Sequence, residues 1–96
     1  MYKQKVAEHD LDELFEAILN LEDKEACYSF FEDLCTVEEI KALAQRWHVA
    51  HLLYDKAKYN DIMKETGASS TTISRVKKCL EYGKGYVTAL EKEKKK

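Results

Sequence analysis

The sequence contains no proline and only three glycines. These two residues destabilise a helix interior more than any others, so little of the chain is barred from helical structure. Hydrophobic residues make up 45% of the chain and charged residues 35%, a balance that suits a globular protein. The composition therefore predicts an all-α protein with short connections between its helices.

The sequence also lacks the features of a secreted or membrane-bound chain. No apolar run approaches the roughly 20 residues that a membrane-spanning helix needs. The three cysteines, Cys27, Cys35 and Cys79, are odd in number and form no C-x-x-C pair, and no basic and apolar leader precedes them. We therefore expect a cytoplasmic protein with reduced thiols and no membrane partner.

The chain is short and its charge is unevenly distributed. A domain of 96 residues buries only a modest share of its surface, which favours association with a second copy. Residues 1–40 carry three lysines and twelve acidic residues, whereas residues 41–96 carry thirteen basic and six acidic residues. With net charges of −9 and +7, only the second part is suited to face a polyanion.

Hydrophobic periodicity predicts two helices before residue 36. The first has Asp10 as a candidate N-cap and Glu13 three residues later, followed by apolar residues at helical spacing. The second follows the polar stretch "EDKE". Its pattern places Cys27 in the core and Cys35 just beyond the helix end.

A longer third helix is predicted to run to about Asp55. Thr36 and Glu39 form a capping box before it, and Trp47 lies on its apolar stripe as a core residue. Beyond Trp47 the apolar residues spread over several faces of the helix, which predicts cover by a second subunit.

Two short helical patterns separated by a turn occupy about residues 59–81, and a lysine-rich helix follows at about residues 86–95. Gly67 lies where the turn needs a left-handed residue, and Ser69 is placed to cap the second helix. No repeat or linker marks a further domain. We expect residues 1–96 to form one domain, with dimerisation helices at about 10–55 and a helix-turn-helix at about 59–81.

The stretch "TGASSTTISRVKK" admits three interpretations. A phosphate-binding loop is excluded because the second glycine and the lysine of that motif are missing. Ser74 and Lys77 spell S-x-x-K, but the companion motifs of such acyl enzymes are absent and the chain is far too short. A helix-turn-helix fits each position, so we expect a DNA-binding protein and not an enzyme.

The small residues at the start of the second helix have a reason in this interpretation. Bulky side chains there would keep the backbone out of the major groove, whereas serine and threonine bond either base edges or phosphates. Lys64, Lys77 and Lys78 are placed to reach phosphates. The alternative is that these lysines only solvate a surface helix, as most charge clusters do.

Two segments, "LCTVEEIKALAQRW" and "IMKETGASSTTISRVKKCLEYG", resemble the trp-repressor superfamily, and more closely its YerC/YecD (TrpR-like) branch. The resemblance covers about residues 11–90 and is most specific from Gly67 to Arg75. It implies a six-helix, intertwined homodimer whose recognition helices enter successive major grooves of a palindromic operator. It also implies DNA-facing positions at Asn60, Ser70, Thr71 and Ser74, while Lys58 replaces a frequent capping serine.

The resemblance further implies a site for a small corepressor. In the family's tryptophan-sensing member, a threonine and two arginines hold the ligand, and Thr36, Arg46 and Arg75 occupy the matching positions. A carboxylate would pair well with either guanidinium. Val76 replaces a glycine that leaves room for an indole ring, which argues against tryptophan. Alternatively, the arginines pair with acids or contact DNA, and Thr36 only caps its helix.

Two further groups of residues have plain explanations. His48, His51 and Asp55 are spaced to share one helix face, as metal ligands would, but a complete ligand set is missing, so we expect no metal site. Tyr82 and Tyr86 flank "GKG" and could stack on single-stranded bases. Packing of the last helix against the domain accounts better for them.

The sequence thus predicts a cytoplasmic, homodimeric, DNA-binding transcriptional regulator, most simply a repressor that occludes a promoter, with no cofactor beyond a candidate corepressor. The alternative is a protein-interaction module that keeps the fold and binds a partner through its acidic helices. The predicted DNA-binding residues are Asn60, Lys64, Ser69, Ser70, Thr71, Thr72, Ser74, Lys77 and Lys78. The candidate ligand-binding residues are Thr36, Arg46, Arg75 and Val76.

Overall fold

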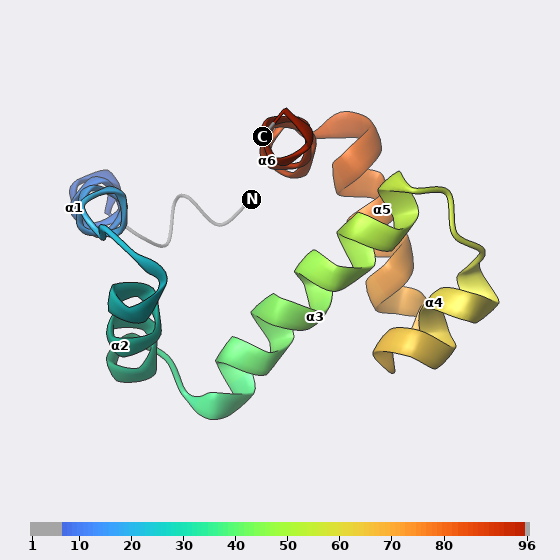
Figure 1. Cartoon of the computed structure of the whole chain (residues 1–96), viewed down its shortest axis with the longest axis horizontal. Helices are drawn as coiled ribbons and strands as arrows, with labels where there is room; N and C mark the ends of the chain where they lie inside the picture. Colours follow the sequence, from blue (N-terminus) through green and yellow to red (C-terminus); the bar gives the residue numbers. More distant parts are fainter. Residues whose placement is uncertain (1–6, 96) are drawn as a thin grey trace. The chain divides into compact units, whose positions relative to one another are not determined.

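The computed structural model describes residues 7–95, which form six α-helices and, within that range, no strand (Figure 1). The all-α, six-helix prediction is confirmed. The helices are α1 (Glu8–Leu19), α2 (Lys24–Leu34), α3 (Val37–Tyr54), α4 (Tyr59–Thr66), α5 (Ser70–Tyr82) and α6 (Gly85–Lys94).

The contacts within the chain divide it into two units, of which the first ends at Val37 and the second begins at Glu38. The first contains α1 and α2, and the second contains nearly all of α3 together with α4, α5 and α6. The expectation that the whole chain acts as one domain stays a prediction.

The first unit has no buried residue in either of its helices. Several of its apolar side chains are open to solvent, with Phe15 54%, Leu19 82% and Tyr28 66% exposed, and others are half-buried. Cys27, predicted to be a core residue, is exposed as well. The helical periodicity was correct, but the burial predicted for Cys27 was wrong within one chain.

The start of α1 differs from the sequence-based expectation. The N-cap residue is Ala7, which makes no side-chain cap, and the predicted cap Asp10 lies inside the first helical turn. A carboxylate there stabilises the helix through its dipole, so the acidic start still has a physical reason. In contrast, α2 has a conventional cap, since Asp23 accepts a hydrogen bond of 2.8 Å from the backbone N–H of Ala26.

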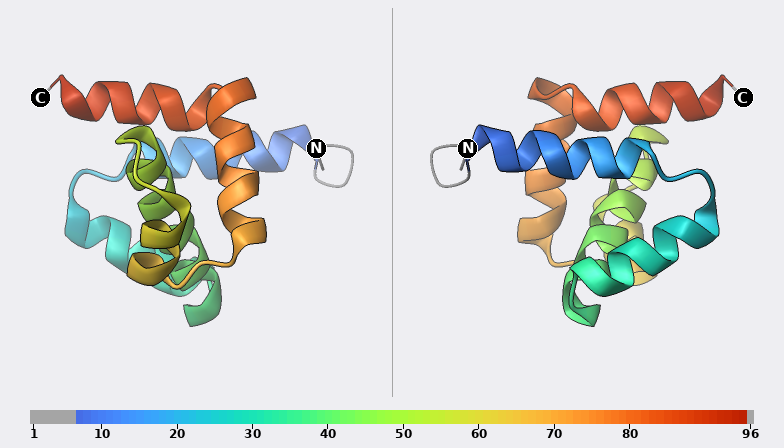
Figure 2. Two further views of the ribbon diagram at one scale, coloured as in Figure 1. Left: turned by 90° about the vertical axis from the view of Figure 1, so that its right-hand side faces the viewer. Right: turned by 90° about the vertical axis from the view of Figure 1, so that its left-hand side faces the viewer.

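The second unit contains the core. Each of its helices and the turn before α5 contributes to a cluster of side chains at most 4% exposed. The members of this cluster are Val49, Ala50, Ile62, Ala68, Ile73, Val76 and Leu90. Figure 2 shows α6 crossing α5, so the small cluster is enclosed by helices that run in different directions.

The α3–α4 and α5–α6 connections are short. α3 ends at Tyr54, where residues up to about Asp55 were predicted, and Lys56 in the following turn has a left-handed φ of 67°. α6 begins at Gly85, one residue before the predicted start at Tyr86. Within residues 7–95, no helix is long and apolar enough to cross a bilayer.

Side chains of α3 and of the turn that follows it contact α6. His51 Nε2 lies 2.9 Å from Glu93 Oε1, and Lys94 Nζ lies 3.4 Å from Asp55 Oδ1. Trp47 packs against the core cluster and stacks on Tyr86, with ring centroids 6.3 Å apart. Trp47 therefore has the packing role predicted for it. Tyr86 packs as we expected, whereas Tyr82, for which the same role was predicted, is 82% exposed.

We predict that Ile62→Ala lowers the free energy of unfolding by about 2–5 kcal/mol, because it leaves a cavity beneath the fully buried side chain. The neighbouring Met63, 39% exposed, provides the control: Met63→Ala should cost less than about 1 kcal/mol. Urea unfolding at one fixed protein concentration measures both. Equal losses would contradict the placement of the core.

Candidate nucleic-acid interface

A sharp turn joins α4 to α5 and makes the two helices a helix-turn-helix unit (Figures 1 and 2). Gly67 ends α4 in the left-handed conformation, with a φ of 73°, and its N–H donates to the carbonyl of Met63 at 2.9 Å. A side chain in this conformation would be strained, which explains the glycine. The turn prediction is confirmed.

The start of α5 is fixed by its first polar side chains. Ser69 is the N-cap, and its Oγ accepts a hydrogen bond of 3.1 Å from the backbone N–H of Thr72. The two hydroxyls also lie 3.2 Å apart and bond each other. The predicted cap is confirmed. Ser69 and Thr72 thus have a structural role, which they hold in addition to their predicted place among the DNA-binding residues.

The two helices bury one face and expose the other. Ile62, Ala68, Ile73 and Val76 point into the core. The opposite surface of α4 and α5 is polar and open to solvent. Its exposed members among the predicted DNA-binding residues are Asn60, Lys64, Ser69, Ser70, Thr71, Ser74, Lys77 and Lys78, and Thr72 is half-buried.

The basic side chains of this surface are not neutralised by neighbouring acids. In the range that the structure covers, Lys64, Lys78 and Arg75 form no ion pair. The Lys77 ammonium lies 5.8 Å from the centroid of the Tyr59 ring, a cation–π contact that leaves its charge uncompensated. The surface therefore keeps positive charge available for an anionic partner.

The candidate ligand residues differ in burial and in the contacts they make. Arg46 on α3 is half-buried and Arg75 on α5 is exposed, and neither forms an ion pair within the described range. Val76 is 1% exposed and belongs to the core cluster, so it fills space instead of lining an open pocket. Thr36 precedes α3 in the first unit, and its place relative to the arginines is not defined.

Neither arginine is among the residues that line two hollows of the second unit. One, of about 350 Å³, is lined by Cys79, Gly83, Gly85 and Tyr86. The other, of about 440 Å³, is lined by Leu53, Tyr54, Lys56, Lys77, Leu80, Glu81 and Val87. Neither hollow includes Arg46, Arg75 or Val76, so neither matches the ligand positions implied by the family resemblance.

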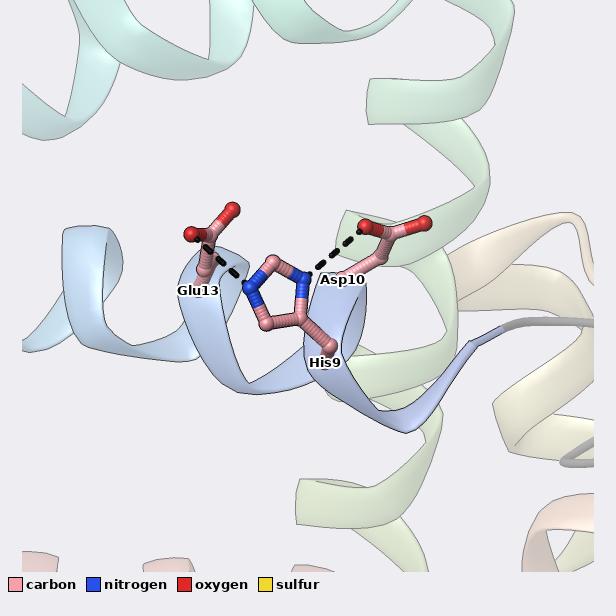
Figure 3. Close-up of side chains that lie close together, drawn as sticks. All are labelled: His9, Asp10 and Glu13. Carbon is pink, nitrogen blue, oxygen red and sulfur yellow. Dashed lines mark ion pairs between the residues drawn. The ribbon is translucent and has the colours of Figure 1, made fainter.

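His48, His51 and Asp55, whose spacing resembles that of metal ligands, contact other described residues. His48 lies 3.2 Å from Glu65, whereas His51 and Asp55 contact α6, so the three side chains point to separate partners. On α1, His9 lies between two exposed carboxylates (Figure 3).

His9, Asp10 and Glu13 each offer one possible ligand atom, and these atoms lie within 4.8 Å of one another. His9 Nδ1 faces Asp10 at 3.5 Å and Nε2 faces Glu13 at 3.4 Å. Exposed acidic groups are common without an ion, so the cluster alone does not identify a metal site. The side chains are also at least 70% exposed.

Sequence reasoning missed one contact that positions the helix-turn-helix. Gln45, half-buried on α3, donates from Nε2 to the backbone carbonyl of Thr66 at the end of α4, at 3.1 Å. The available signal was an uncharged polar residue between Ala44 and Trp47, two members of the apolar stripe of the helix. Nothing local identified its partner, which lies 21 residues away.

The fold and this surface define an all-α protein with a helix-turn-helix of the DNA-binding kind. The family model described as Trp repressor protein matches residues 9–94, and the chain belongs to this family. The family consists of regulatory DNA-binding proteins and not of enzymes.

Similar proteins cover nearly the whole chain. YerC, an uncharacterised protein of Bacillus subtilis (strain 168), is 52% identical over 95 residues, which span 98% of this chain and 91% of YerC. A crystal structure of a candidate Trp repressor from Staphylococcus aureus has a TM-score of 0.90 and 47% identity, covering 98% of this chain and 95% of that one. A TrpR-like protein from Eubacterium eligens ATCC 27750 has a TM-score of 0.87 and 46% identity, covering 93% of each chain.

We predict that Gly67→Ala destabilises the protein by about 1–2 kcal/mol, since alanine resists the left-handed conformation. A Cβ at Gly67 meets nothing within 4 Å, so the whole cost comes from the backbone. Gly85→Ala is the matched control, because its Cβ also meets nothing within 4 Å and its φ is not positive. Thermal unfolding of both variants checks this, and a loss at Gly85 as large as that at Gly67 would refute the explanation.

Proposed function

We propose that this protein is a sequence-specific transcriptional regulator that binds a palindromic operator as a homodimer and represses by occluding a promoter. The observation that carries the proposal is the exposed first half of α5. It presents Ser70, Thr71 and Ser74 to solvent while Ile73 and Val76 hold the helix on the core.

The geometry suits docking in the major groove. The groove is about 12 Å wide and admits a helix, and short hydroxyl side chains let the backbone approach the base edges closely. Such side chains reach the bases directly or through water, and readout through water is known from the complex of the Trp repressor with its operator. Asn60 on α4 is exposed beside this surface and adds a further polar contact.

The uncompensated lysines supply the affinity in this proposal. Lys64 lies on α4, and Lys77 and Lys78 lie on α5, all exposed to solvent. Contacts with phosphates release counterions, so each should steepen the dependence of binding on salt. These contacts place α5 in the groove, while the hydroxyls discriminate between sequences.

The apolar surface of the first unit supports the homodimer. α1 and α2 bury none of their residues within one chain, although Phe15, Leu19 and Tyr28 would gain from burial. A second copy of the chain offers the same apolar surface, and a two-fold arrangement presents two α5 helices to DNA. The acidic residues of this unit favour a position away from the phosphates.

A small corepressor with a carboxylate is part of the proposal. Arg46 and Arg75 are without ion pairs in the described part of the chain, so their guanidinium groups are available for an anion. The burial of Val76 favours a ligand smaller than tryptophan, or a site that uses only the polar groups.

We predict that purified protein enriches a two-fold symmetric site from genomic fragments at near-physiological salt. Thr71→Glu should weaken binding to that site at least about tenfold, because a carboxylate would face the DNA. Thr88→Glu adds the same charge at an exposed position of α6 and serves as the control, with binding unchanged.

A second arm of this selection adds a mixture of amino acids and small carboxylic acids. If the protein enriches the site only when the mixture is present, and Arg46→Gln abolishes that enrichment, the result would support the corepressor. A folded dimer that enriches no site in either arm would contradict DNA regulation. If reversing the charges of Lys77 and Lys78 then left the cellular effect intact, the protein-interaction module would be the better account.

We predict that Leu19→Asp shifts the protein from dimer toward monomer, because a carboxylate would lie in the proposed subunit interface. Leu19 and Tyr82 are each 82% exposed in one chain, so Tyr82→Asp is a matched control that should stay dimeric. Sedimentation equilibrium measures the mass of both variants. A wild-type mass equal to the 11.2 kDa of one chain would contradict the homodimer.

A further inference from the structure

The end of α4 is tied to α3 by two polar contacts. Gln45 Nε2 donates to the Thr66 carbonyl at 3.1 Å, and one helical turn further along α3, His48 Nε2 lies 3.2 Å from Glu65 Oε2. The histidine pair is 46% and 57% exposed and therefore weak through solvent screening. The Gln45 contact is partly buried and depends less on solvent.

Thr66 makes hydrogen bonds with α3, with its own helix α4 and with the turn before α5. Its carbonyl is one of the last four of α4, which lack a partner within the helix, and Gln45 supplies that partner. Its Oγ1 donates to the Ile62 carbonyl at 2.7 Å and accepts from the Ala68 N–H at 3.1 Å. Gln45 is thus bonded to the residue that also organises the turn.

We propose that Gln45 is a positioning residue for specific DNA recognition, because its hydrogen bond to Thr66 fixes the turn and so the direction in which α5 leaves it. This inference rests on the proposed function. α5 begins at Ser70, four residues after Thr66, so a rotation of the turn is carried directly into the recognition helix.

Specific and non-specific binding should respond differently to Gln45. Attraction between lysines and phosphates tolerates a small change in the angle of α5, whereas hydrogen bonds to base edges do not. Loss of the Gln45 contact should therefore reduce the preference for the operator without reducing general affinity for DNA. A residue with only a structural role would leave the preference unchanged.

Two variants remove the amide donor, and a control variant leaves it in place. Gln45→Met preserves the length of the side chain without an N–H, and Gln45→Glu turns an acceptor toward the carbonyl. His51→Gln is the control, since it alters a polar contact of the same helix that reaches Glu93 on α6 instead of the helix-turn-helix.

The test compares dissociation constants for the selected operator and for an unrelated duplex at one salt concentration. Preference for the operator is the dissociation constant for the unrelated duplex divided by that for the operator. With Gln45→Met, this ratio should fall about 3- to 10-fold, the loss expected for one hydrogen bond. Gln45→Glu should lower it at least as much, and His51→Gln should leave it unchanged. An unchanged ratio in Gln45→Met, or equal weakening on both duplexes, would overturn the proposal.

Hydrogen exchange without DNA separates this inference from the proposed function. In Gln45→Met, the backbone amide of Ala68 should exchange at least about threefold faster, while that of Leu90 on α6 should not change. If the wild-type protein selects no operator, the proposed function fails and the recognition role fails with it. Faster exchange at Ala68 would still show that Gln45 fixes the turn, whereas unchanged exchange would refute that as well.

Discussion

The burial of α5 on a very small core is the constraint on which the rest of the structure depends. Ile73 and Val76 are at most 1% exposed, and they meet Ile62 from α4 and Val49 from α3 in one cluster. Since the core is so small, a few contacts set the orientation of α5. The same packing that stabilises the second unit therefore decides which side chains face outward.

The outward face follows from that burial and from the turn before it. The left-handed Gly67 and the cap at Ser69 define where α5 begins, and Gln45 holds the preceding carbonyl from α3. Within the described residues, the lysines of this surface form no ion pair, whereas twelve of the eighteen acidic residues of the chain lie before residue 41. This arrangement agrees with membership of the Trp repressor family, because the family regulates transcription by binding DNA.

Local signals in the sequence were sufficient for the helix-turn-helix. A glycine for a left-handed turn and a serine for a cap each act within a few residues, so both could be identified without any knowledge of the fold. The apolar stripes of α1 and α2 were equally clear, but periodicity shows which face is apolar and not what covers it. For that reason the predicted burial of Cys27 was wrong within one chain.

The remaining differences concern the start of α1 and a contact between residues far apart in the sequence. Asp10 has the chemistry of a cap, yet the N-cap of α1 lies three residues earlier, at Ala7. The bond between Gln45 and Thr66 joins residues 21 positions apart, and no pattern in the sequence specifies it. The DNA-binding and ligand-binding roles of individual side chains stay predictions, because they depend on partners outside the single chain.

In the proposed complex, two copies of α5 enter neighbouring major grooves. Protection of guanine N7 from methylation on the selected operator tests it most directly, since this atom lies in the major groove. The account predicts two clusters of protected guanines centred about 10 base pairs apart, one for each α5 of the dimer. Bound DNA with no protected guanine N7 in either half-site, or with a single cluster, would contradict it.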